Sequence, residues 1–320
     1  MLSRHAEDLF WAGRYIERAD DTARLLDVTY HGLLESPLAD AATSWRELLE
    51  VLSLEHAFDA RHPTVTGAAV SAFLVLDADN PGAITSAVSH ARENARNVRE
   101  RISTELWEAI NTFHLELRGR NLREDLERQP YQLYSLVKSR CQAIAGVASE
   151  TMSRDDGWRF LLLGRMLERA EMTCRLLSVR FGSHASTGLH ADVHYWMAVL
   201  KSVSAFEAYV KVNRAEIDRT DVLEFLLLSR EFPRSVLFCL RASERELARL
   251  GAGLQPSRPE RLLGRLRADL EFADVHELLE AGLVESLETV QDGIRSAADA
   301  VASHFFLGSA SPTLHAFEAA

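Results

Sequence analysis

Apolar residues recur every three to four positions along most of the chain, a spacing that places them on one face of an α-helix. The first segment with this pattern starts near Ser3, a good N-cap residue, and runs to about His31-Gly32. Breaker residues at 77–82 predict a turn that opens another helix. Convincing strand alternation is absent, so the pattern predicts an all-α, multi-helix bundle. The further predicted helices span 44–60, 68–76, 82–102, 103–118, 131–153, 155–181, 189–212, 221–230, 232–250 and 259–303, the last with at least one break.

Residues that break helices are scarce. The 320 residues include 16 Gly and 8 Pro, which favours long helices over a many-stranded sheet, whose turns need more of both. No linker is long or polar enough to force a domain boundary, although the loop at 182–188 is the best place for one. The sequence therefore predicts one helical domain over 1–320, or two intimately packed halves at about 1–153 and 154–320.

The net charge, the apolar runs and the cysteines limit the classes of protein to which this chain can belong. The formal net charge is −11 and the pI about 5.6. This acidic balance argues against a protein that binds along the phosphate backbone of a nucleic acid. No uncharged apolar run reaches the 18 residues of a membrane span, and Glu7 and Asp8 stand where a secretion signal would be apolar. Three widely separated cysteines fit a reducing compartment. We therefore expect a cytoplasmic protein that binds neither membrane nor nucleic acid.

One segment of the first predicted helix occurs twice. The stretch 13–28, which begins Gly-Arg-Tyr-Ile-Glu-Arg-Ala, returns 151 residues later at 164–179 as Gly-Arg-Met-Leu-Glu-Arg-Ala, and ten of sixteen positions are identical. Generic amphipathicity rarely reproduces identities at that density. The match predicts an internal duplication that places the two Gly-Arg-x-x-Glu-Arg helices centrally in the bundle.

The repeated charges fall on one helix face, because residues three, four and seven apart are neighbours on a helix. Gly13 and Gly164 stand where a helix prefers Ala, at a cost of about 1 kcal/mol each. That repeated cost predicts that another helix or a ligand approaches the backbone there. The first charged stripe consists of Arg14, Glu17, Arg18 and Arg24, and the second of Arg165, Glu168, Arg169 and Arg175.

Three interpretations of the stripes are open. They can be solvated helix faces with weak ion pairs, or buried Arg–Glu pairs that fix the register of two helices. Alternatively, the two copies face each other across a pseudo-twofold axis, and their guanidinium groups line one pocket for a carboxylate or phosphate. Such a site would be asymmetric, because Asp21 of the first copy corresponds to Met172 of the second.

Two other groups of polar residues are candidate sites. Within 92–99, Glu93, Asn94 and Arg96 either join the central site or belong to a solvated charged face. His190 and His194 have the i,i+4 spacing of metal ligands. No Glu-x-x-His pair accompanies them, so the di-iron bundle pattern fails, and we predict neither a metal nor a cofactor.

Several segments resemble a known family. The run 1–19, with Leu-Phe-Trp before Gly-Arg-Tyr-Ile-Glu-Arg-Ala, is similar to the bacterial alpha-E family of helical proteins with a Glu-Arg motif. The segments 92–99, 107–111, 164–170 and 225–236 match the same pattern in the family's order. One departure is Ser229-Arg230, where members often have Asp-Pro before Glu-Phe-Pro-Arg-Ser.

The resemblance implies a setting for the protein. Members are encoded beside, or fused to, circularly permuted ATP-grasp proteins, often near transglutaminase-like peptidases. The expected function is therefore that of a cytosolic component of a system that forms or modifies peptide or amide bonds. Its expected partners are the ATP-grasp protein, a transglutaminase-like protein, and an anionic peptide or small molecule.

Two other functions compete with this one. In the first, the protein is an enzyme in its own right, with Glu17 or Glu168 as general acid or base. In the second, it is a structural adaptor whose Arg–Glu pairs only hold helices in register. In the leading interpretation Glu17 and Glu168 orient the arginines or accept an ammonium group of the substrate. The anionic groups are bound by Arg14, Arg18, Arg165 and Arg169.

Overall fold

A computed structural model describes residues 1–35, 40–183, 189–213, 217–251 and 255–306. Within these ranges the chain forms sixteen α-helices, one short 3-10 helix and no strand, so the prediction of an all-α fold is confirmed. None of the described helices combines the length and apolar character needed to cross a membrane. The helices group into two compact units, one from the described parts of residues 1–165 with 305–306 and one from those of residues 166–304.

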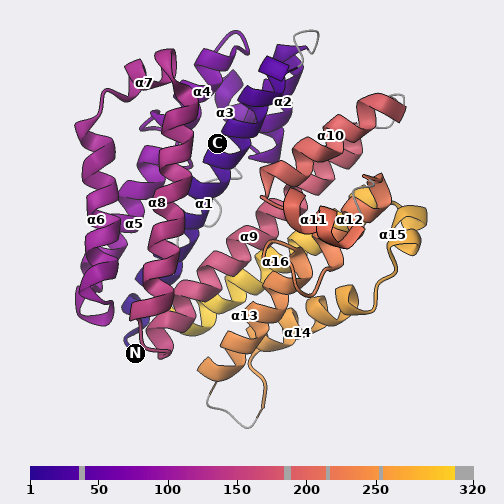
Figure 1. Cartoon of the computed structure of the whole chain (residues 1–320). Coiled ribbons are helices and arrows are strands. Elements are labelled where there is room, and N and C mark those ends of the chain that lie inside the picture. The colour runs from indigo at the N-terminus through magenta and orange to yellow at the C-terminus, as the bar shows by residue number, and fades with distance from the viewer. Residues whose placement is uncertain (36–39, 184–188, 214–216, 252–254, 307–320) are drawn as a thin grey trace. The chain divides into compact units, whose positions relative to one another are not determined.

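The first unit contains eight whole helices and the beginning of a ninth (Figure 1). Helices α1, α5, α6 and α8 form a four-helix arrangement in which each packs against two of the others. Helix α1 is buried along most of its length, because apolar and charged residues alike face neighbouring helices. The helices are α1 (Ser3–Glu35), α2 (Ala41–Val51), α3 (Glu55–Asp59), α4 (Gly67–Val75), α5 (Ile84–Asn97), α6 (Thr104–Gly119), α7 (Leu122–Arg128), α8 (Pro130–Thr151) and the start of α9 (Asp156–Ser183).

The second unit contains the rest of α9 and seven further helices. Helix α12 packs against α10, α11, α13, α14 and α15, and its apolar side chains from Val222 to Leu227 fill the interior of this unit. The helices are α10 (Leu189–Ser202), α11 (Phe206–Asn213), α12 (Arg219–Leu228), α13 (Val236–Leu250), α14 (Arg258–Glu271), α15 (Val275–Ala281) and α16 (Leu283–Phe305).

Two predicted helices, 44–60 and 189–212, are each two helices. The breaks lie at Ser53 and Ser204, which have φ of 55° and 50° and are the two non-glycine residues with positive φ in the described ranges. After each serine a backbone N–H donates to the carbonyl five residues earlier, at 2.9 Å for Leu54 to Leu49 and 2.7 Å for Ala205 to Leu200. This is the hydrogen bond of a Schellman C-cap, which usually requires glycine. Serine gave no such signal in the sequence.

Other predicted boundaries also need correction. The segment 259–303 is three helices, with a break at Gly282, whose φ is 102°. Helix α13 begins at Val236 rather than 232, because Ser235 is its N-cap and the preceding residues form a turn. Helix α7 was missed, although Asn121 is an N-cap with Glu124 in the first turn. The predicted loop at 182–188 overlaps the end of α9, and its residues 184–188 lie outside the described ranges.

Local features recur in the two units at a spacing of 151 or 152 residues. Thr66 and Asp218, 152 residues apart, are the N-caps of α4 and α12. The turns that follow these helices also match, because the N–H of Ala83 donates to the carbonyl of Asn80 and that of Ser235 to Phe232, each at 3.0 Å. The positive-φ serines are 151 residues apart. The same element order and the same turn chemistry therefore occur in both units.

Candidate functional site: the charged face of the repeated helix

Helix α1 and the beginning of α9 touch through their backbones at two glycines. A Cβ atom on Gly13 would lie 2.2 Å from the carbonyl oxygen of Leu161, and one on Gly164 would lie 2.0 Å from that of Phe10. Phe10 and Leu161 are each three residues before the glycine of their own helix, so the contact is reciprocal. The prediction that these glycines permit a close approach is confirmed, and the approaching element is another helix.

The first charged stripe is buried in the first unit. Exposed fractions are 5% for Arg14, 2% for Glu17 and 6% for Arg24, whereas Arg18 is partly exposed. The interpretation of this stripe as a solvated face is therefore wrong for the three buried residues. Helices α5 and α8 pack against α1, and periodicity alone could not show such tertiary packing.

Two ion pairs organise the buried charges. Arg165 Nε lies 3.5 Å from Glu17 Oε2, and the exposed fractions of these side chains are 14% and 3%. Arg165 follows Gly164 in the second copy of the repeat, and Glu17 is the glutamate of the first copy. The contact therefore joins residues of the two copies. Arg24 Nε donates to Asp20 Oδ2 at 2.9 Å, and both side chains are buried. Buried charges of this kind are tolerated only when they are paired.

Asp20 completes an acidic cluster that the sequence analysis did not single out. Oxygen atoms of Glu17, Asp20 and Asp21 all lie within 4.8 Å of one another, and all three residues are buried. The i,i+4 spacing of Asp20 and Arg24 was the available signal. Carboxylates at this spacing can hold a cation, but Arg24 and Arg165 already supply positive charge to Asp20 and Glu17. Two of the three carboxylates are therefore paired with arginines.

The second charged stripe lies in α9 and fastens a turn in the second unit. Glu168 and Arg169 are buried, with exposed fractions of 4% and 8%. Arg169 Nη1 donates to the carbonyl oxygen of Pro233 at 3.0 Å, and Thr173 Oγ1 donates to that of Arg234, also at 3.0 Å. Arg175 pairs with Glu171 one helical turn earlier. The bond from Arg169 to Pro233 therefore has a structural role.

The turn that Arg169 contacts contains Ser229, which stands where proteins with the similar pattern often have Asp. The Ser229 hydroxyl oxygen accepts from the N–H groups of Glu231 at 3.4 Å and Phe232 at 3.1 Å. In the equivalent turn of the first unit the Asp77 carboxylate accepts from the N–H of Asp79 at 2.9 Å. A hydroxyl therefore substitutes for the missing acid, and the turn persists.

Two of the three candidate residues of α5, Glu93 and Arg96, belong to a surface network. Glu93 pairs with Arg92 and with Arg96, at 2.6 Å for the latter. The Arg96 side chain is 59% exposed, and Asn94 is partly exposed. Arg92 also donates to Asn111 Oδ1 at 3.0 Å. For Arg96 the interpretation as part of a solvated face is confirmed. His194 is exposed, and the side chain of His190 lies outside the described residues.

Comparison with known proteins identifies the family. A model of the Alpha-E family, a predicted alpha-helical domain with a conserved ER motif, matches residues 1–306. The chain belongs to the Alpha-E family. The repeated Glu-Arg pairs, Glu17-Arg18 and Glu168-Arg169, lie on the two helices whose contacts are described above. No solved structure matches the Alpha-E chain.

Relatives of this Alpha-E chain are longer proteins. It is 26% identical over 327 residues to the Uncharacterized protein Rv2567 of Mycobacterium tuberculosis (strain ATCC 25618 / H37Rv). It is 27% identical over the same length to the Uncharacterized protein Mb2597 of Mycobacterium bovis. Both matches cover 92% of this chain and 36% of the relative. The chain therefore spans about a third of the length of these relatives.

The three cysteines are predicted to be unreactive in the folded protein. All are buried. Burial, reinforced by the Asp20 and Glu17 carboxylates, raises the pKa of Cys141, and burial with Glu171 nearby raises that of Cys174. Because the thiolate is the reactive form, iodoacetamide labelling followed by mass spectrometry should show modification only at the rate of unfolding. Rapid labelling of any of the three under native conditions would contradict this expectation.

Proposed function

We propose that this Alpha-E chain is a helical component of an ATP-grasp-associated system that forms or modifies peptide or amide bonds. The family resemblance supplies this setting. The coverage of the curated relatives supports it, because an Alpha-E segment that makes up 36% of a longer chain works beside other parts of that chain. In this role the chain binds an anionic group of a peptide, a metabolite or the ligase itself through its charged stripes.

The observation that carries the binding role is the pair of Glu17 and Arg165. Its acid is almost fully buried, while the Arg165 side chain is 14% exposed. A buried carboxylate that pairs with an arginine restricts the orientation of the planar guanidinium group. A guanidinium oriented in this way binds a carboxylate or phosphate in two-point fashion, which the point charge of lysine does not reproduce.

The substitution Arg165→Lys tests this proposal, because it keeps the charge and removes the fork of donors. The chain would be combined with an ATP-grasp protein of the same organism, and ATP-dependent amide product would be measured together with the melting temperature. We expect the rate of product formation to fall about tenfold or more, which corresponds to about 1.4 kcal/mol. The matched control is Arg159→Lys on the same helix, whose side chain is 20% exposed and pairs with Asp156.

The outcomes separate the three functions. Wild-type product formation by the Arg165→Lys chain would contradict the proposed binding role. Loss of folding in that variant would instead favour the structural adaptor, an alternative that the burial of Arg14, Glu17 and Arg24 supports. A Glu17→Gln or Glu168→Gln chain that folds and binds the ligase, but gives no product, would favour an enzyme that uses these acids directly.

We further propose that the chain arose by duplication of an eight-helix segment, so that α1–α8 correspond to α9–α16. The sixteen-residue match, the paired N-caps Thr66 and Asp218, and the positive-φ serines Ser53 and Ser204 support this origin. The two copies then diverged in function. One difference between the copies is Asp21 of the first, which is replaced by Met172 in the second.

A further inference from the structure

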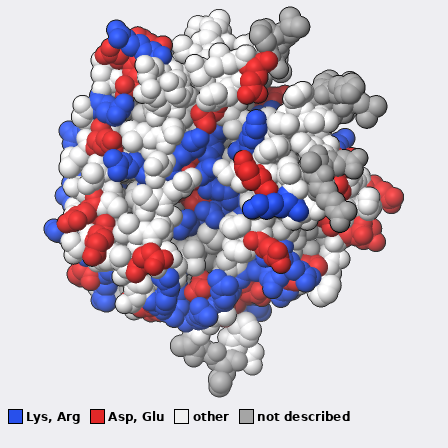
Figure 2. All heavy atoms as spheres, viewed as in Figure 1, with Lys and Arg blue, Asp and Glu red and all other residues white. Residues whose placement is uncertain are grey.

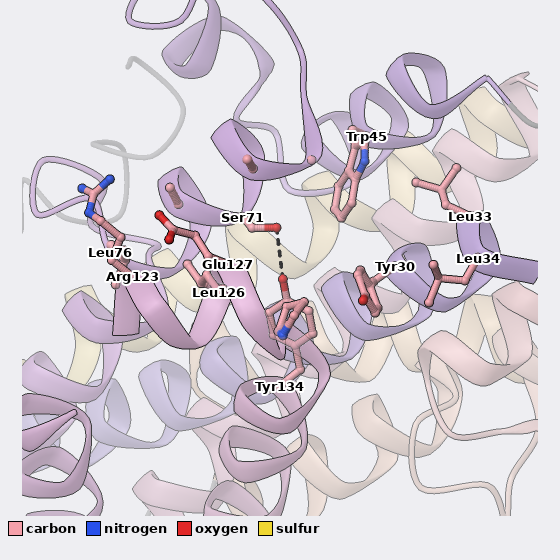
Figure 3. A pocket seen from close by; sticks show the side chains of 14 residues that line it. Tyr30, Leu33, Leu34, Trp45, Ser71, Leu76, Arg123, Leu126, Glu127 and Tyr134 are labelled. Atoms are coloured by element: carbon pink, nitrogen blue, oxygen red, sulfur yellow. Dashed lines mark hydrogen bonds between the residues drawn. The ribbon is translucent and has the colours of Figure 1, made fainter. Parts of the chain in front are cut away.

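A cavity of about 530 Å³ lies in the first unit, away from the buried charges of α1 (Figure 3). It is formed by the C-terminal end of α1 together with α2, α4, α7 and α8. Cavities of roughly 300–1,000 Å³ with aromatic and aliphatic walls are typical of small-molecule sites. The lining is mainly apolar, with Tyr30, Leu33, Trp45, Ala72, Leu76 and Leu126 among its side chains.

A pair of hydroxyl groups interrupts the apolar wall. Tyr134 donates its O–H to Ser71 Oγ at 3.0 Å, and Figure 3 shows this pair between Leu126 and Glu127 on one side and Tyr30 and Trp45 on the other. Burial raises the pKa of Tyr134 to about 12, so its phenol is a neutral donor at physiological pH. Since the Ser71 oxygen accepts this bond, its own hydrogen is available for an acceptor within the cavity.

The second unit has larger residues at the equivalent positions. Gly67 and Ser71 of α4 correspond to Arg219 and Leu223 of α12, 152 residues later. The Arg219 guanidinium lies 4.7 Å from the centre of the Phe181 ring, which itself packs 4.5 Å from Trp196, the counterpart of Trp45. A Cβ on Gly67 would approach Trp45 Nε1 to 2.9 Å. The small Gly67 and Ser71 therefore distinguish the first position from the second, where Arg219 and Leu223 are larger.

We propose that this cavity binds a neutral, mainly apolar small molecule whose carbonyl oxygen accepts a hydrogen bond from Ser71. At about 30 Å³ for each water-sized group, its volume accommodates roughly 15 to 20 heavy atoms. The aromatic side chains favour a flat ring system. A neutral ligand is favoured because Arg123 and Glu127 contribute opposite charges to the lining, and because burial of a carboxylate against apolar walls is costly. This site is separate from the Arg165 site and does not depend on it.

Three probes of equal size test the inference on the full chain. They are 2-acetonaphthone, with a carbonyl oxygen, 2-isopropylnaphthalene, which lacks it, and 2-naphthoate, which is an anion. Binding would be measured by saturation-transfer NMR and calorimetry. We expect 2-acetonaphthone to bind most tightly, and Ser71→Ala to weaken its binding about tenfold while leaving 2-isopropylnaphthalene unchanged. The matched control is Ser243→Ala, which removes another buried hydroxyl, on α13 in the second unit.

The substitution Ala72→Phe should abolish binding of both uncharged probes, because it fills the cavity from one of its walls. Circular dichroism and the melting temperature would verify that each variant folds. Absence of saturable binding, or equal loss of 2-acetonaphthone binding in the Ser71→Ala and Ser243→Ala chains, would overturn the proposal. Tighter binding of 2-naphthoate than of the uncharged probes would overturn the proposal that the ligand is neutral, and would indicate Arg123 as the residue that binds the anion. The Arg165→Lys chain should bind the probes as the wild type does.

Discussion

The substitution Gly164→Ala is expected to destabilise the protein by at least about 3 kcal/mol, near the upper end of the range for overpacking. The added methyl group would lie 2.0 Å from the carbonyl oxygen of Phe10, which is a backbone atom. A side chain could rotate away, but the backbone of α1 can move only if the helix shifts as a whole. Gly13→Ala should have a similar effect, because its Cβ would lie 2.2 Å from the carbonyl oxygen of Leu161. Urea unfolding followed by circular dichroism measures both changes.

The matched control is Gly146→Ala within α8. A Cβ at this position has no atom within 4 Å, and alanine is the better helix former by about 0.8–1 kcal/mol. This control should therefore be slightly more stable than the wild type. Because Gly13 and Gly164 belong to one contact, the double substitution should cost less than the sum of the single ones. A Gly164→Ala chain as stable as Gly146→Ala would show that α1 and α9 do not touch in this way.

The repeat motif made this contact predictable, whereas other features of the fold were not. Two glycines at equal positions of a repeated helix indicate a close approach, because alanine is otherwise preferred. Ser53 and Ser204 gave no comparable signal, since positive φ is unusual for serine. Each therefore ended a helix inside a segment that was predicted as continuous.

Burial of the charged stripe could not be read from the sequence. Arg, Glu and Asp are rarely fully buried, so periodicity assigns them to the surface unless their partners are known. The visible surface of the molecule does carry acidic and basic side chains interspersed (Figure 2), and Arg96 is among the exposed ones. The cavity was equally hidden, because Tyr30, Trp45, Ser71 and Tyr134 are distant in the chain and meet only in the folded unit.

The substitution Arg24→Met should destabilise the first unit by about 3–5 kcal/mol. Arg24 donates to Asp20 at 2.9 Å, and the exposed fractions of the two side chains are 6% and 5%. Removal of the guanidinium leaves Asp20 beside Glu17 and Asp21 without this donor, and repulsion among close carboxylates is strong where water is excluded. Methionine fills a similar volume, so the effect reports on charge rather than on a cavity. Urea unfolding measures the loss.

Two matched variants isolate the cause of this loss. In Arg128→Met the lost partner is Glu124, also four residues away, but these side chains are 76% and 47% exposed, and the change should stay within about 0.5 kcal/mol. In the double variant Asp20→Asn with Arg24→Met, both charges are removed together, and most of the lost stability should return, because an uncompensated buried charge is what makes the single change costly. If the double variant is no more stable than Arg24→Met alone, pairing with Asp20 is not what keeps Arg24 inside the protein.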